Sequence, residues 1–333
     1  MTHGGRLFEI ANARGWDWRD ILDFSASINP LGPSPAVLEA IRAAASEIAH
    51  YPESHPRQLI SALAKAWSVS EDKILLGNGA TDLIHFLGTV FREHAATLCT
   101  PLFSEFHRVF PRAHIAGLNQ PEMWPSTGLT VVTRPANPTG ELVSFDNWLA
   151  RTTHPVIVDE SFIEFAEVPS LASLIDTRPN LLVLRSLTKF HGIPGLRVGA
   201  LIAARKKIAE WRELRDPWSV NVLAIRAACA SLADSEHSRR TLETVRSERA
   251  WLATAMSSLP GVAVNPSSAN YLFVRLQYPA ASLTAFLEDR KILIRDCTGW
   301  PGFDAANGVR VAVRTRPENE RLIAAWQEFS CES

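Results

Sequence analysis

The sequence predicts an α/β protein in which a large, mostly parallel sheet is covered by helices and followed by a smaller α+β region. From residue 56 to about 205, short apolar segments alternate with segments that have the period of an amphipathic helix. Strands that are buried on both faces have continuous apolar runs, and their alternation with helices is typical of a parallel sheet. After Asp216-Pro217 the pattern changes to long helical segments and weaker strands, which indicates a second region.

The expected elements follow one another along the chain. In the first region we expect helices over residues 56–67 and 80–91. Strands are expected there over residues 73–76, 96–99, 129–133, 155–158, 181–184 and 197–202. In the second region we expect helices over residues 220–232, 238–257 and 318–329, and strands over residues 271–276, 292–294 and 309–313.

Charge and composition exclude several classes of protein. The formal net charge of −1 argues against a nucleic-acid-binding surface or a polybasic membrane contact. No apolar run approaches the roughly 20 residues that a transmembrane helix needs. The four cysteines are far apart, and the first residues lack the apolar segment of a signal peptide. We therefore expect a cytoplasmic protein with no metal site, no disulfide framework, and no nucleic-acid or membrane partner.

Two turns that follow expected strands have the composition of ligand-binding loops. The segment Gly77-Asn-Gly-Ala-Thr-Asp82 lies between a strand and a helix, where glycines and free backbone N–H groups suit an anion. A plain strand–helix turn explains this segment equally well. The segment Arg134-Pro-Ala-Asn-Pro-Thr-Gly140 also follows a strand, and its composition is that of a tight loop.

Two further strand ends carry ionisable residues. The strand Val156-Ile-Val158 ends in Asp159-Glu160, which suits either a nucleotide-hydrolase metal site or a carboxylate that pairs with a protonated ring nitrogen. The first alternative needs a GxxxxGK[ST] loop, which the chain does not contain. Ser186-Leu-Thr-Lys189, followed by Arg197, suits an amine that forms a Schiff base beside a phosphate. Taken alone, a lysine is more often a surface residue, so this segment by itself favours that interpretation.

Together and in this order, the four segments resemble the aspartate-aminotransferase superfamily of pyridoxal-5′-phosphate (PLP) enzymes, fold type I, over nearly the whole chain. The resemblance implies that Lys189 carries the cofactor as a Schiff base and that Asp159 keeps the pyridine nitrogen protonated. It further implies that Phe106 stacks on the ring and that Asn137 bonds the ring hydroxyl. The remaining cofactor contacts that it implies are Gly79, Ala80, Thr81, Ser186 and Arg197.

The resemblance also implies a domain organisation. A large PLP-binding domain is expected over residues 36–215 and a small C-terminal domain over residues 216–333. Residues 1–35 are expected to form an N-terminal segment that joins the small domain and the active site.

Other segments resemble the threonine-phosphate decarboxylases of cobalamin biosynthesis, within the histidinol-phosphate aminotransferase-like branch. These segments are His3-Gly-Gly5 and the stretches 23–32, 186–190, 216–221 and 310–315. Phe162 stands where many aminotransferases have a tyrosine, and the decarboxylases tolerate this change. The resemblance therefore implies decarboxylation of a small phosphorylated amino acid, with a histidinol-phosphate (or related) aminotransferase as the alternative.

The same resemblance implies a homodimer with shared active sites. Tyr51 is expected to reach the substrate phosphate from the partner subunit. The other substrate contacts that it implies are His3, Asn29, Arg295 and Arg310. A guanidinium binds carboxylate and phosphate equally well, so the anion that each arginine holds is left open. Arg310 could also be a strand residue in a surface salt bridge, and His191 is assigned no role.

Overall fold

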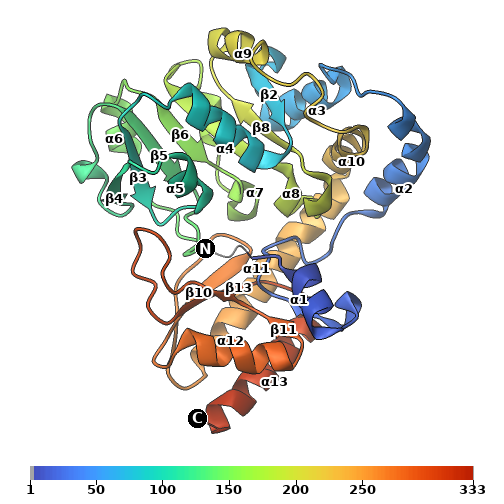
Figure 1. Cartoon of the computed structure of the whole chain (residues 1–333), viewed down its shortest axis with the longest axis vertical. Coiled ribbons are helices and arrows are strands. Elements are labelled where there is room, and N and C mark those ends of the chain that lie inside the picture. The colour runs from blue at the N-terminus through green and yellow to red at the C-terminus, as the bar shows by residue number, and fades with distance from the viewer. Residues whose placement is uncertain (1–3, 333) are drawn as a thin grey trace.

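The structure, a computed structural model, describes residues 4–332 and contains a larger sheet of seven strands and a smaller sheet of four, each packed with helices, together with a two-stranded pair (Figure 1). The larger sheet has seven strands in the order β2-β8-β7-β6-β5-β3-β4. Its strands are β2 (Ile74–Gly77), β3 (Ala96–Thr100), β4 (His114–Gly117), β5 (Leu129–Thr133), β6 (Val156–Asp159), β7 (Leu181–Ser186) and β8 (Gly199–Ile202). Neighbouring strands are parallel except at β8, which is antiparallel to β2 and β7. The predicted mostly parallel sheet is confirmed.

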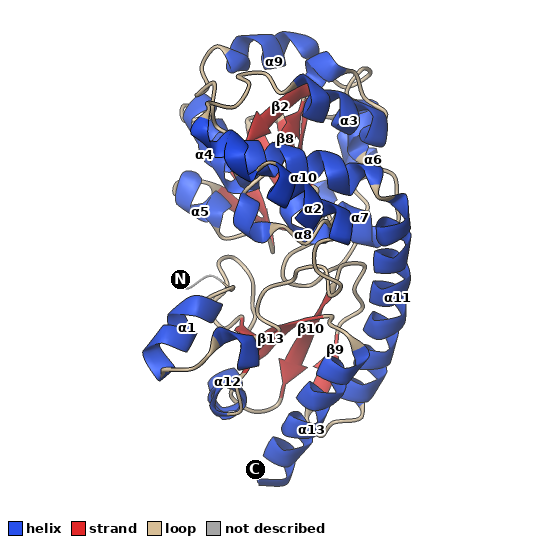
Figure 2. Ribbon diagram, turned by 90° about the vertical axis from the view of Figure 1, so that its right-hand side faces the viewer, coloured by secondary structure: helices blue, strands red, loops and turns tan. Residues whose placement is uncertain are grey.

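Helices cover both faces of this sheet, which explains its continuous apolar strands. In Figure 2, α4 and α5 lie on one side of the sheet, and α6 and α7 lie on the other. The helices of this part are α2 (Pro35–Ala43), α3 (Arg57–Trp67), α4 (Gly79–Val90), α5 (Glu105–Val109), α6 (Asp146–Arg151), α7 (Ile163–Ala166), α8 (Leu187–Phe190), α9 (Arg205–Arg212) and α10 (Val222–Ala233). The edge strand β4 was not expected from the sequence, because only Ala116 of its four residues is buried.

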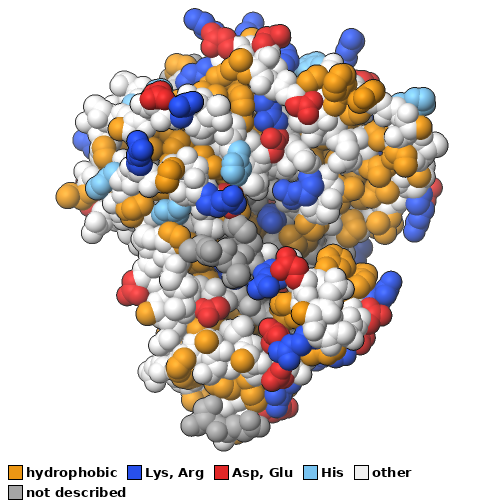
Figure 3. All heavy atoms as spheres, viewed as in Figure 1, with side chains coloured by type: hydrophobic (Ala, Val, Ile, Leu, Met, Phe, Trp, Pro, Cys, Tyr) orange, Lys and Arg blue, Asp and Glu red, His pale blue; other side chains and the backbone are white. Residues whose placement is uncertain are grey.

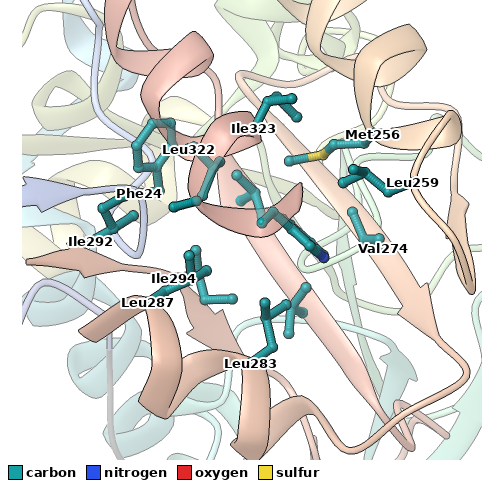
Figure 4. Close-up of a cluster of buried hydrophobic side chains, with 14 of the residues drawn as sticks. Phe24, Met256, Leu259, Val274, Leu283, Leu287, Ile292, Ile294, Leu322 and Ile323 are labelled. Atoms are coloured by element: carbon teal, nitrogen blue, oxygen red, sulfur yellow. The ribbon is translucent and has the colours of Figure 1, made fainter. Parts of the chain in front are cut away.

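The smaller sheet is antiparallel, with the strand order β12-β13-β10-β9. Its strands are β9 (Val262–Val264), β10 (Tyr271–Leu276), β12 (Arg295–Asp296) and β13 (Gly308–Ala312). The helices beside it are α1 (Leu7–Arg14), α11 (Ser235–Ser257), α12 (Ala280–Asp289) and α13 (Arg316–Glu332). Apolar side chains of α11, α12, α13 and the sheet form the core drawn in Figure 4, in which Leu283, Met256 and Leu322 come from three different helices.

The N-terminal segment is bound to this smaller part. Strand β1 (Leu22–Asp23) pairs in parallel with β11 (Ile292–Leu293). The backbone continues this contact beyond β1, because Phe24 N donates to Leu293 O at 2.7 Å and Ala312 N donates to Phe24 O at 2.9 Å. Phe24 is also part of the core in Figure 4. The residues that follow Phe24 are therefore positioned by the smaller sheet.

Helix α11 connects the two parts of the molecule (Figure 2). Its 23 residues extend roughly 35 Å at 1.5 Å per residue. It begins after Asp234, whose Oδ1 accepts a hydrogen bond from His237 N at 2.9 Å, a typical N-cap. The preceding helix α10 packs on α2 and α3, beside the larger sheet. The domain boundary near Asp216 stays a prediction.

Within residues 4–332, no helix combines the length and the apolar character that crossing a lipid bilayer requires.

Candidate active site

A cavity of about 190 Å³ lies between the two sheets. The last residues of β5, β6 and β7 line it from one side, and residues of β12 and β13 line it from the other. Ligands of α/β sheets gather at the carboxyl ends of the strands, so this is the expected location. The predicted site residues that line the cavity are Ala80, Thr81, Asn137, Asp159, Ser186, Lys189, Arg197, Arg295 and Arg310.

Lys189 lies in α8, directly after β7, and its side chain lines the cavity. The hydroxyl of Ser186 caps this short helix by accepting a hydrogen bond from Thr188 N. Burial in the protein, followed by the nearby charges of Arg310 and Arg197, lowers the pKa of Lys189 from 10.5 to about 8. A substantial fraction of this amine is therefore neutral near pH 8, which suits a nucleophile that bonds a carbonyl carbon.

Asp159 ends β6 and is 4% exposed. Its Oδ1 accepts hydrogen bonds from Ser161 Oγ at 2.5 Å and from Ser161 N at 3.0 Å. Burial raises the pKa of Asp159, and the hydrogen bonds from Ser161 act in the opposite direction. A cation placed against this carboxylate would offset the cost of burying its charge, as the protonated nitrogen of a pyridine ring does.

The start of α4 forms an anion cradle with Arg197. Gly79 begins the helix with φ +80°, and a Cβ at this position would clash with the Arg197 guanidinium. Glycine therefore lets the guanidinium lie against the first turn, whose backbone N–H groups lack partners within the helix. Ser186 Oγ and Thr188 Oγ1, which lie 2.7 Å apart, line the same cavity. N–H groups, hydroxyls and a guanidinium are the donors that a phosphate group requires.

Arg295 and Arg310 form the opposite wall. They are direct partners in the antiparallel pair of β12 and β13, so their side chains lie on the same face of the sheet. Arg310 donates from Nη1 to Asn137 Oδ1 and from Nη2 to Ser25 O, each at 2.8 Å. Its Nε is buried without a hydrogen bond among the described residues. Burial, followed by the charge of Arg310, lowers the pKa of Arg295.

Four predicted site residues do not line the cavity. Gly79 acts through the backbone cradle described above. Phe106 is 0% exposed and packs in the core beside α4, whereas Phe103, in the loop before α5, lines the cavity. Tyr51 is 81% exposed and stacks on Trp218 with ring centroids 4.8 Å apart. The roles of Phe106 and Tyr51 stay predictions.

Asn29, the fourth of these residues, supports the backbone around Lys189. Asn29 N donates to Lys189 O at 3.0 Å, and Asn29 Nδ2 donates to Phe190 O at 2.8 Å. The same amide also donates to Thr241 Oγ1 on α11 at 2.8 Å. Its role in substrate binding stays a prediction, and the predicted contact His3 lies outside the described residues.

Several residues that line the cavity were not predicted. Thr133 ends β5, and the rule that ligands gather at strand ends would have identified it. The others are brought in by packing or by segments without a recognisable pattern. They are Gly4, Ser25, Ala26, Ser27, Ile84, Phe103, Ser104, Ser161, Phe162, Thr188 and Trp300.

The residues of the cavity fit PLP. Buried Ser27 Oγ, Thr133 Oγ1 and Arg310 Nε have no hydrogen-bond partner among the described residues, so a polar ligand would complete their bonding. The cradle of Gly79 and Arg197 would hold the phosphate. Asp159 would hold the ring nitrogen, and Lys189 would bond the aldehyde carbon.

Comparison with known proteins identifies the family. Residues 19–126 and 115–325 match the family of aminotransferase class I and II. The chain is 35% identical to threonine-phosphate decarboxylase of Salmonella typhimurium, with 97% of this chain and 95% of that protein covered. It is 32% identical to histidinol-phosphate aminotransferase of Symbiobacterium thermophilum, with 92% and 90% covered. The crystal structure of L-threonine-O-3-phosphate decarboxylase from Porphyromonas gingivalis has a TM-score of 0.85 at 27% identity, with 94% and 100% covered. These matches confirm the predicted fold type I architecture and the predicted cofactor, and the chain belongs to the class I and II aminotransferase family.

Proposed function

We propose that the protein decarboxylates L-threonine O-3-phosphate to (R)-1-amino-2-propanol O-phosphate, with PLP bound at Lys189. The observation that carries the proposal is the pair of Arg295 and Arg310 at the cavity wall. Each residue is only 8% exposed, and neither forms an ion pair with a carboxylate among the residues whose side chains are described. Two adjacent buried cations without ion-pair partners favour the binding of anions, and a phosphorylated amino acid supplies two.

The charges of the whole cavity support a dianionic substrate in addition to the cofactor. Arg197 also lacks a carboxylate partner among the described residues, and its Nη1 donates to Pro194 O at 3.1 Å. The cavity thus contains three guanidinium groups and the amine of Lys189, against the single carboxylate of Asp159. The cofactor phosphate would occupy the cradle at Arg197. The other two arginines then remain for the carboxylate and the phosphate of the substrate.

The residues of the chain would act by orienting the substrate and by moving one proton. When bound, PLP supplies an electron sink for the pair released at the substrate Cα. Arg295 and Arg310 hold the two anionic groups, which fixes rotation about the N–Cα bond. The bond between Cα and the carboxylate breaks, carbon dioxide leaves, and one proton is added to Cα. We assign that proton to Lys189 Nζ, because its pKa of about 8 suits transfer near neutral pH.

A histidinol-phosphate aminotransferase is the second candidate, because such enzymes are also among the relatives. Phe162 favours the decarboxylase. It lines the cavity, and its ring packs edge-on against Tyr271 with centroids 5.0 Å apart, where many aminotransferases would offer a tyrosine hydroxyl. The segments that resemble decarboxylases, at residues 23–32 and 310–315, supply Ser25 and Arg310 to the same wall.

We also propose a homodimer in which Tyr51 completes the neighbour's site. Tyr51 lines a surface depression with Glu47, His50 and Arg226, and it is not part of its own chain's cavity. Because Tyr51 is 81% exposed, it can contact substrate only if the cavity of a second copy lies against it. Figure 3 shows hydrophobic side chains gathered on this side of the molecule, over α2 and α10. Ile48 and Leu38 are exposed there, at 67% and 41%.

The reaction would belong to cobalamin biosynthesis in the cytoplasm. The relatives named as threonine-phosphate decarboxylases support the first part of this proposal. The four cysteines, all free and without a disulfide, support a reducing compartment.

Product analysis of two incubations tests the proposed function. The first contains L-threonine O-3-phosphate and no keto acid, and the second contains L-histidinol phosphate with 2-oxoglutarate. We expect carbon dioxide and the amino-alcohol phosphate from the first and no glutamate from the second. Glutamate formation without carbon dioxide release would make the protein an aminotransferase.

A further inference from the structure

The loop that follows β12 is bound tightly to the larger sheet. In this segment, the 297–303 loop, Gly302 O accepts a hydrogen bond from Thr100 Oγ1 at 2.5 Å. The backbone of Gly302 has φ +67°, and a Cβ there would lie 2.8 Å from Thr100 Cγ2. Both the conformation and the close approach therefore require glycine. His107 of α5 also bonds the carbonyl of Pro301. The loop thus spans from the smaller sheet to the larger one beside the cavity.

Trp300 is the residue of this loop that faces the cavity, and its ring is held at two points. Its Nε1 donates to Leu102 O at 2.9 Å, and the ring packs with Phe273 and Cys297. The side chain is 6% exposed and lines the cavity together with Arg295, whose Cζ lies 5.8 Å from the ring centroid. Protein interiors are closely packed, so the Trp300 ring cannot move aside to make room for a larger ligand group.

The surface that Trp300 presents to the cavity is apolar. The indole has one hydrogen-bond donor, and Leu102 O already accepts from it, so Trp300 offers only carbon to a ligand. A methyl group forms no hydrogen bonds, so contact with such a surface leaves none of its groups unpaired. An imidazole ring needs more space than a methyl group, and the face of Trp300 offers its nitrogens no hydrogen-bond partner. Burying a polar group without a partner is strongly unfavourable, so contact with Trp300 discriminates between the two.

We propose that Trp300 is a specificity-determining residue, which admits the methyl-bearing chain of L-threonine O-3-phosphate and excludes the imidazole-bearing chain of L-histidinol phosphate. This inference rests on the proposed function, because it assigns the substrate to the arginine wall. The arginines bind the charged groups of the substrate, and Trp300 selects its uncharged side chain.

Binding and turnover of the two phosphorylated amines test this inference in the holoenzyme. Dissociation constants are measured from the change in cofactor absorbance on titration, and carbon dioxide release is measured separately. In Trp300→Ala, we expect affinity for L-threonine O-3-phosphate to fall about tenfold and affinity for L-histidinol phosphate to rise about tenfold. Trp300→Phe retains an apolar wall, and its ratio of the two affinities should stay within about threefold of the wild type.

The controls separate selectivity from stability. Trp18→Ala removes an indole that is 42% exposed on the smaller part, and it should leave both affinities unchanged. Trp300→Leu replaces Trp300→Ala if the alanine variant does not fold, as judged by circular dichroism. Equal loss of both affinities, or no change in either, would overturn the role of Trp300. Absence of carbon dioxide from the wild type, with the affinity ratio still shifting in the variant, would instead overturn the proposed decarboxylation alone.

Discussion

The two ends of the cavity are built in different ways. The cofactor end consists of Asp159 and Ser186 at strand ends of one sheet and of Lys189 in the helix α8 that follows, with the Gly79 turn and Arg197 beside them. The substrate end joins residues far apart in the chain, as in the hydrogen bond from Arg310 to Ser25 O across 285 positions. Local strand-to-helix turns therefore determine the first end. Packing of the N-terminal segment on the smaller sheet determines the second.

This difference allows the two ends to change separately. The strands that carry the cofactor end are buried along their whole length, so substitutions there disturb the core. The substrate end also includes the two-residue strand β12 and the 297–303 loop, which lie outside that sheet. A family can therefore keep one cofactor chemistry and alter the substrate. We expect variants at the cofactor end to lose cofactor attachment, and variants at the substrate end to retain it.

Lys189→Ala should have the largest effect, because it removes both the cofactor bond and the proton carrier. We expect kcat to fall by at least about 10³-fold. Borohydride reduction followed by peptide mass spectrometry should find PLP on Lys189 of the wild type and on no lysine of the variant. Lys206→Ala, which alters an exposed lysine of α9, serves as the control and should behave as the wild type. Turnover at the wild-type rate in Lys189→Ala would refute the assignment.

Arg310→Ala should have the next largest effect, and it tests the separation of the two ends. We expect kcat/KM for L-threonine O-3-phosphate to fall about 100-fold, or about 2.7 kcal/mol, because an anion contact is lost and Asn137 loses its donor. PLP should remain bound to Lys189. Arg275→Ala is the matched control, because Arg275 is an exposed arginine of β10 in the same sheet. Loss of cofactor attachment in Arg310→Ala would mean that the two ends are not separable.

The pH dependence of cofactor capture tests the environment of Lys189. Because its pKa is lowered to about 8, only the fraction of neutral amine reacts, and that fraction increases through this pH. We expect the rate at which the apoprotein attaches PLP to rise about tenfold per pH unit below pH 8 and to level off above it. Stopped-flow absorbance measures this rate. A rate that continues to rise to pH 10 would indicate a lysine with its ordinary pKa.

Tyr51→Ala should have a smaller effect, and mixed dimers show whether the residue acts across the interface. We expect kcat/KM to fall about tenfold, or about 1.4 kcal/mol, because a hydrogen bond to a charged group is lost. Tyr51→Ala and Lys189→Ala subunits, mixed under exchange conditions, should form hybrid dimers with one intact site each. Equal mixing should then give about a quarter of the wild-type activity. A mixture no more active than its two components would contradict a shared site.

The cofactor end could be predicted from the sequence and the substrate end only in part. A strand followed by a turn is a local pattern, so the segments around Gly79, Asp159 and Lys189 could be located before the fold was known. Trp300 could not be located in this way, because its place in the cavity depends on a hydrogen bond to Leu102, in the loop that follows β3 of the other sheet. Phe103 was missed because the resemblance indicated Phe106, and helix geometry points the latter into the core.

The most direct test of the proposed reaction follows both products of one labelled substrate. L-threonine O-3-phosphate labelled with ¹³C in its carboxylate is incubated in D₂O with the holoenzyme and no keto acid. Decarboxylation predicts one ¹³CO₂ for each amino-alcohol phosphate formed, and one deuteron at the carbon that bore the carboxylate. Retention of the ¹³C label in a keto acid, with the amino group left on the cofactor, would contradict the account.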